Sequence, residues 1–83
     1  MNVWILIKLS NTGLGYHCDI VDLFTDEIKA IAKLKIVAQE FIDDFKIKSD
    51  EILCNENDYI EIERTQPSSE YVHAEFQIKC KKL

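Results

Sequence analysis

The residues best suited to chemistry lie in two polar rows near the C-terminal end of the sequence. Within 59–64 and 71–81, alternating positions are apolar, and the positions between them carry tyrosine, histidine and glutamate. Side chains two apart on a strand point to the same face, so each row predicts one polar face. Carboxylates and imidazoles can hold a metal ion or exchange protons. The residues of the two rows are Tyr59, Glu61 and Glu63, then Tyr71, His73 and Glu75.

A catalytic or metal site would need more than these rows contain. The chain has only two histidines, His17 and His73, and they fall on different predicted strands. A small hydrolase or metal enzyme would require both to converge with carboxylates such as Asp19. No serine or cysteine nucleophile with a placed base is visible. We therefore expect no catalytic residues, no metal site and no cofactor, and we expect that the protein is not an enzyme.

Charge and composition narrow the classes of partner. The net charge of −5 disfavours direct binding to nucleic acid, which needs clustered Lys or Arg, and it permits a partner with a basic surface. The longest apolar run, Val3–Ile7, is too short for a bilayer helix, and no basic segment precedes it as in a signal peptide. Cys18, Cys54 and Cys80 lack metal or disulfide spacing, which predicts reduced, half-buried thiols in the cytoplasm.

Two strands are predicted in the first 24 residues. Val3 to Leu9 alternates and is apolar on both faces at its start, which is typical of a central strand that is covered on both sides. Gly13-Leu14-Gly15 lacks the residues of a phosphate loop and predicts a hairpin turn within 10–15. Tyr16–Phe24 follows, with Asp22 out of phase, which predicts either a bulge or an early end of the strand near Asp22.

One long helix is predicted from about Asp26 to Phe45, with Thr25 as its N-cap. Its broad apolar face should pack on a sheet. Ile28, Ala32 and Ile36 form a second, narrower stripe, and we expect Trp4 and Leu6 to be further apolar residues in excess of the core. The stripe is either a contact for a partner or second copy, or it is enclosed by 46–54. The broad face comprises Ala30, Ile31, Leu34, Val37, Ala38, Phe41, Ile42 and Phe45.

The remaining segments complete an α+β fold. After a polar connection, 51–54 is either a short strand or a helical turn capped by Ser49. A turn at 55–58 leads to strands at 59–64 and 71–81, joined by a loop over 65–69. The chain is predicted to be one domain, 1–83, with two layers, in which the helix packs on a four- to five-stranded, mainly antiparallel sheet.

Charge favours one register of the C-terminal hairpin. Placing Ile62 opposite Val72 sets Glu61 against His73 and Tyr59 against Glu75. A shift of two residues would set Glu61 against Glu75, and such like-charge pairs are destabilising. We therefore predict the first register. The polar rows then form one tyrosine, histidine and glutamate patch, which is either a solvated outer face or a partner surface.

The segment Cys18 to Ala30 resembles small uncharacterised phage and bacterial α+β proteins. In these, a strand ends in a phrase such as Phe24-Thr25-Asp26-Glu27-Ile28-Lys29-Ala30 and enters one long helix. The likeness covers about the first 45 residues and implies this topology, with no catalytic residues. Abundant isoleucine and lysine, against four alanines and one arginine, also indicate an AT-rich bacterial or phage gene.

These observations favour a small acidic, non-enzymatic binding protein in the cytoplasm of a bacterial cell. A phage-encoded inhibitor of host defence, of the anti-CRISPR type, fits this class, with a basic protein or nucleoprotein as the partner. The alternative is a homodimeric module that senses or sequesters a small ligand or nucleotide. The residues predicted to bind are those of the polar rows together with Ile28 and Ile36.

Overall fold

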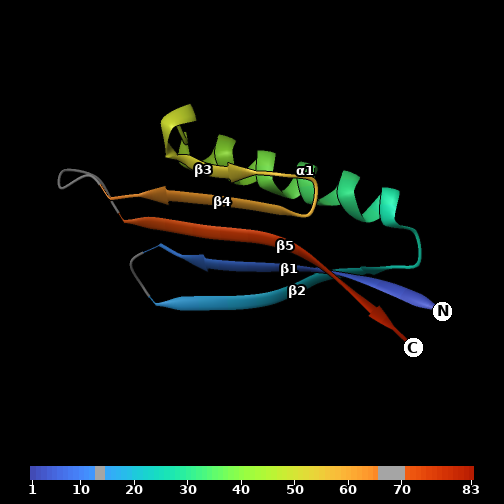
Figure 1. Ribbon diagram of the computed structural model, residues 1–83. Helices are drawn as coiled ribbons and strands as arrows, with labels where there is room; N and C mark the ends of the chain where they lie inside the picture. The colour runs from blue at the N-terminus through green and yellow to red at the C-terminus, as the bar shows by residue number, and fades with distance from the viewer. Residues whose placement is uncertain (13–14, 66–70) are drawn as a thin grey trace.

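The computed structural model describes residues 1–12, 15–65 and 71–83 and confirms the predicted two-layer α+β fold. One helix packs on a five-stranded antiparallel sheet (Figure 1). The predicted loop over 65–69 falls almost wholly outside the described residues, as do two residues of the first turn. The elements are β1 (Asn2–Asn11), β2 (Tyr16–Phe24), α1 (Glu27–Phe45), the 3₁₀ turn η1 (Ser49–Glu51), β3 (Ile52–Asn55), β4 (Tyr59–Arg64) and β5 (Val72–Lys82).

The strands lie in the order β2-β1-β5-β4-β3, so β1 is interior to the sheet, as its apolar start predicts. Of the two alternatives near Asp22, the bulge is present and β2 continues to Phe24. Leu6 pairs with Asp22 whereas Ile7 pairs with Ile20, which leaves Val21 as the extra residue on β2. The side chain of Leu23 therefore shares a face with that of Ile20, although simple alternation would separate them.

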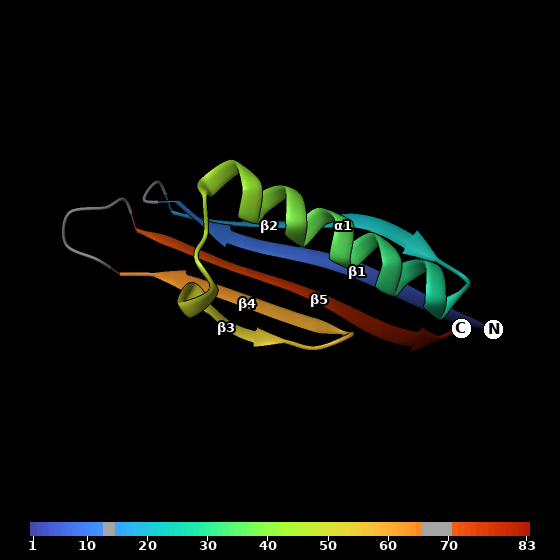
Figure 2. The ribbon, with the colours of Figure 1, turned by 90° about the horizontal axis from the view of Figure 1, so that it is seen from above.

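Helix α1 begins one residue later than predicted, because Asp26 and not Thr25 is its N-cap. The Asp26 carboxylate accepts a hydrogen bond of 2.9 Å from the backbone N–H of Ile28. The helix ends at Phe45, and its C-cap Lys46 adopts a left-handed conformation with φ of 52°. Figure 2 shows α1 lying along the middle of the sheet, with β3 to one side.

The core lies between α1 and the covered face of the sheet. Leu34, Ala38 and Phe41 of α1 are buried against alternating residues of the strands. The rings of Phe41 and Phe76 meet edge to face, with centroids 5.7 Å apart. Leu6 is fully buried here, so the expectation that it is excess to the core was wrong. The strand residues of the core are Leu6, Ile60, Ile62, Val72, Ala74 and Phe76.

The opposite side of the sheet, hereafter the open face, carries no helix (Figures 1 and 2). Ile5, Ile7 and Leu9 alternate with buried Leu6 and point to the open face, where they are half-buried. The prediction that the first strand is covered on both sides was therefore wrong. The neighbouring strands β2 and β5 shield only the edges of β1. Because no second layer covers the open face, that face of β1 remains accessible.

The segment between α1 and β4 combines the two alternatives left open by the sequence. Ser49–Glu51 forms a single 3₁₀ turn, and Ile52–Asn55 forms a short edge strand beside β4. The N-cap of this turn is Lys48 and not Ser49.

The two ends of the chain lie side by side, because β1 and β5 pair along their whole length. The backbone N–H of Leu83 donates to the carbonyl of Met1 over 2.8 Å, and the N and C labels of Figure 1 lie at one end of the sheet. Among the described residues, α1 is the one α-helix, and it is not apolar enough to cross a membrane.

Candidate functional site

The open face is divided into a polar half and an apolar half. The polar half lies on β4 and the neighbouring part of β5, and it contains five of the six residues predicted from the two polar rows. The sixth, Tyr71, directly precedes β5. The apolar half lies on β1 and β2. The polar half is Tyr59, Glu61, Glu63, His73 and Glu75, and the apolar half is Val3, Ile5, Ile7, Leu9, Ile20 and Leu23.

The predicted register of the β4–β5 hairpin was wrong. Ile62 lies opposite Ala74 and not Val72, so Glu61 lies directly opposite Glu75. The like-charge pair is tolerated because Tyr59 and His73 both reach Glu75. The predicted pairs, Tyr59 with Glu75 and Glu61 with His73, still meet, but as diagonal neighbours, which long and aromatic side chains can span.

Glu75 is the centre of the hydrogen bonding in the polar half. Its Oε1 accepts a hydrogen bond of 2.5 Å from the Tyr59 hydroxyl, and its Oε2 lies 3.1 Å from Nε2 of His73. These two hydrogen bonds, that from Tyr59 first, lower the pKa of the Glu75 carboxyl. The hydrogen bond to Glu75 and then burial raise the pKa of Tyr59. The pair therefore keeps a phenol protonated beside an ionised carboxylate.

His73 is the most enclosed residue of the polar half, with 9% of its surface exposed. The ring of Tyr16 approaches it edge to face, with centroids 6.2 Å apart. Nε2 of His73 also lies 3.9 Å from Oε2 of Glu61. Nδ1 is buried and has no hydrogen-bond partner within the described part of the chain. The imidazole is thus held by packing on one side and faces two carboxylates on the other.

Tyr16 and Tyr71 extend the polar half towards β2. Burial first, and then a hydrogen bond to Tyr16, raise the pKa of the Tyr71 hydroxyl. Sequence analysis placed Tyr71 in the patch but missed Tyr16, which comes from a strand two positions away in the sheet. Nothing in the local pattern of 16–24 could show that this tyrosine reaches β5.

The apolar half exposes large aliphatic side chains. Ile20 is 68% exposed and Leu23 is 58% exposed, and they lie opposite Ile7 and Ile5 on β1. Sequence analysis also missed this surface. The signal was present in the predicted bulge near Asp22, because a bulge brings Ile20 and Leu23 to one face.

The second helix stripe points away from the sheet. Ile28 is 78% exposed and Ile36 is 52% exposed, and Ala32 between them is also exposed. The alternative that 46–54 encloses this stripe was therefore wrong. The stripe and the open face lie on opposite sides of the molecule, so one flat partner could not contact both.

The two histidines do not converge. His17 pairs with Ser10, which pairs with buried Ala74, so His17 points to the covered side of the sheet, whereas His73 points to the open face. A site built from both histidines is therefore excluded. The cysteines are free, but only Cys54 is half-buried, and Cys18 and Cys80 are exposed, contrary to expectation.

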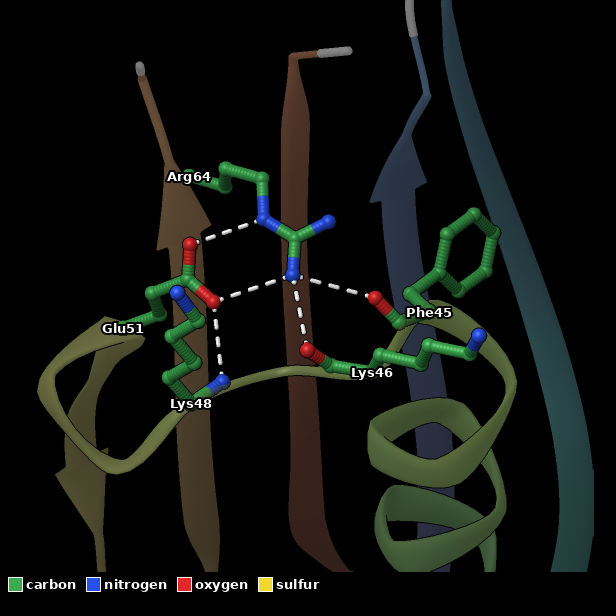
Figure 3. A network of polar contacts seen from close by, with 5 residues as sticks. All are labelled: Phe45, Lys46, Lys48, Glu51 and Arg64. Atoms are coloured by element: carbon green, nitrogen blue, oxygen red, sulfur yellow. Dashed lines mark hydrogen bonds and ion pairs between the residues drawn. The ribbon is translucent and has the colours of Figure 1, made fainter. Parts of the chain in front are cut away.

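A second polar cluster lies at the edge of the covered face (Figure 3). The Arg64 guanidinium binds both carboxylate oxygens of Glu51, at 2.7 and 3.0 Å, and donates to the carbonyls of Phe45 and Lys46 at 3.0 Å each. The backbone N–H of Lys48 also donates to Glu51 over 2.8 Å. Arg64 therefore ties the end of α1 to β4. Sequence analysis did not anticipate it, because the partners are far apart in the chain.

A cavity of about 470 Å³ lies between the start of α1 and the β3–β4 turn. Trp4 and Ile31 contribute apolar surface, and the indole N–H of Trp4 donates to Glu27 over 3.1 Å. Glu27, Glu56 and Asp58 give its rim a negative charge. Its volume falls within the range of small-molecule sites.

Comparison with protein-family models, curated proteins and solved structures found no match to this chain. The function must therefore be argued from the surfaces described above.

Proposed function

We propose that the protein is a non-enzymatic binding domain that docks a basic protein partner on the open face of its sheet. The observation that carries the proposal is the division of that face into two adjoining halves. Ile20 and Leu23 present accessible apolar surface on one side, and Glu61, Glu63 and Glu75 present carboxylates on the other. An apolar contact area beside a charged, tyrosine-rich area is typical of protein interfaces.

The chemistry of the partner follows from the charges. The carboxylates of Glu61 and Glu75 face His73 in the polar half, Glu63 lies on the same strand as Glu61, and the whole chain carries a net charge of −5. A surface of opposite sign, with Lys or Arg around an apolar centre, complements both halves at once. Tyr59 and Tyr71 contribute large side chains that lose little entropy on binding.

The test compares two matched double variants in a pull-down from bacterial lysate. Ile20→Lys with Leu23→Lys changes the open face, and Ile28→Lys with Ile36→Lys changes the helix stripe by the same charge at similarly exposed positions. We expect wild type and the helix variant to retain the same basic protein, with retention weakened by salt. The open-face variant should lose it.

If the open-face variant retains the basic protein and the helix variant loses it, the partner binds the helix stripe on α1 and not the open face. If wild type retains no protein even at low salt, the proposed function is wrong. The alternative, a small-ligand module, is supported by the cavity beside Trp4. A rise in Tm with small organic cations, in the absence of any protein partner, would favour that alternative.

A further inference from the structure

The polar half contains three potential metal ligands from two neighbouring strands. His73 and Glu75 are two residues apart on β5 and point to the same face, and Glu61 lies opposite Glu75 on β4. One ligand atom from each of the three residues lies within 4.8 Å of the others. The observed register creates this grouping. In the register predicted from charge, Glu61 and Glu75 would not have been opposite.

The two distances from His73 to the carboxylates are close to those of tetrahedral coordination. Nε2 of His73 lies 3.1 Å from Oε2 of Glu75 and 3.9 Å from Oε2 of Glu61. Two ligands that each lie about 2.1 Å from a zinc ion at the tetrahedral angle are separated by about 3.4 Å. The ligand atoms of Glu61 and Glu75 lie within 4.8 Å of each other and would have to move closer together around the ion.

Two of the three ligands are already oriented by neighbours. The hydroxyl of Tyr59 donates to Oε1 of Glu75, which leaves Oε2 directed towards His73. The His73 ring is largely buried against Tyr16. Partners that fix the orientation of ligands strengthen metal binding. Glu61 is the most accessible ligand, which leaves a path for the ion to enter.

We propose that Glu61, His73 and Glu75 bind a divalent transition-metal ion, with Zn²⁺ as the best match and water at the fourth position. One imidazole and two carboxylates form a nitrogen and oxygen donor set that suits Zn²⁺. The ion would also neutralise two carboxylates that otherwise repel each other across the strands. The site does not depend on the proposed partner, because all three ligands come from one chain.

The affinity should be moderate. Coordination through Nε2 puts the imidazole hydrogen on Nδ1, for which the described residues provide no acceptor. Loss of such an outer hydrogen bond typically costs 10- to 100-fold in affinity, on the order seen when these partners are mutated in metalloproteins. We therefore expect a micromolar dissociation constant.

The test is calorimetric titration of the metal-free protein with Zn²⁺, on the wild type and three variants. Wild type should bind one equivalent, and Glu61→Gln and His73→Gln should each weaken binding at least about 10-fold. Glu63→Gln is the matched control, because Glu63 lies on the same strand and face and its change removes the same charge. This control should keep wild-type affinity within about 3-fold.

Cobalt identifies the donor atoms independently. Co²⁺ at the proposed site should give a visible spectrum without the thiolate charge-transfer band that Cys18, Cys54 or Cys80 would produce. Absence of Zn²⁺ binding to wild type, equal losses in Glu61→Gln and Glu63→Gln, or a thiolate band would each overturn the proposal. If His73→Gln does not fold, the comparison of the two glutamate variants still decides, because both carboxylates are at the surface.

Discussion

The two faces of the sheet each carry a polar cluster, and the two clusters are built in opposite ways. At the edge of the covered face, Arg64 meets both oxygens of Glu51 and two helix carbonyls, so a positive charge faces a negative one. On the open face, Glu61 lies opposite Glu75, and His73 between them leaves Nδ1 unpaired within the described residues. The first cluster completes its own hydrogen bonding, whereas the second has capacity left for another group.

This difference separates a structural role from a binding role. A charge cluster that satisfies itself stabilises the fold and has little to offer a ligand. A cluster with like charges and an unpaired buried nitrogen is costly in the isolated chain, and such features concentrate at functional sites.

Arg64→Met should destabilise the protein most. It removes the ion pair with Glu51 and the hydrogen bonds to the carbonyls of Phe45 and Lys46, and it leaves Glu51 without its positive partner. We expect a fall in Tm on the order of 5 °C or more, measured by circular dichroism. Lys29→Met, which removes an exposed charge on α1, is the control and should change Tm little. Equal effects of the two changes would contradict the assigned role.

The stability of the fold should depend on pH through the cluster of Arg64 and Glu51. The hydrogen bond from Arg64, followed by that from the backbone of Lys48, lowers the pKa of Glu51 from 4.5 to about 2. The unfolded chain therefore takes up a proton before the folded chain does, and stability present above about pH 5 is lost as the pH falls towards 2. Urea denaturation at several pH values measures this loss.

The Arg64→Met variant provides the control for the pH series. Without Arg64, the pKa of Glu51 should return towards its ordinary value, and its contribution to the acid-dependent loss should shrink. The difference in stability between wild type and variant should therefore narrow as the pH falls. A difference that stays constant down to pH 3 would show that the ion pair does not hold the pKa of Glu51 low.

Glu61→Gln should change the stability of the fold least, and it should raise stability, whereas Arg64→Met lowers it. In metal-free buffer it removes the like charge opposite Glu75 and should stabilise the fold by about 0.5 kcal/mol. The same change at Glu51 should destabilise, because Glu51 faces Arg64. Chemical denaturation of both variants in EDTA measures the two signs. A loss of stability in Glu61→Gln would mean that Glu61 stabilises the isolated chain, as Glu51 does, and would contradict the contrast between the two clusters.

The sequence predicted the elements better than it predicted their pairing. Periodicity located the ends of the helix and the strands within two residues, and it placed the tyrosine, histidine and glutamate rows on one face. The predicted register of the β4–β5 hairpin was wrong because it was based on a single repulsive pair, Glu61 with Glu75. The observed register occurs together with contacts between residues that are distant in the sequence, such as Phe41 with Phe76 and Arg64 with Glu51. No local sequence pattern reveals these contacts.

The apolar half of the open face illustrates the same limit. Alternation in 3–9 correctly indicated an interior strand, but it could not show whether a second layer would cover Ile5 and Ile7. That outcome depends on how many helices the chain contains, and this chain has one α-helix among its described residues. A bulge at Val21 then added Leu23 to the uncovered side.

The pairing of β1 with β5 at the middle of the sheet has a consequence for how the chain folds. Asn2 pairs with Lys82 and Asn11 with His73, so most of the chain lies between the partners. The other strand pairs join neighbours in sequence. Closing so long a loop costs more entropy than forming a hairpin, and contacts of high sequence separation slow folding. The two hairpin units can form early, but the sheet becomes continuous only when the last strand has joined the first.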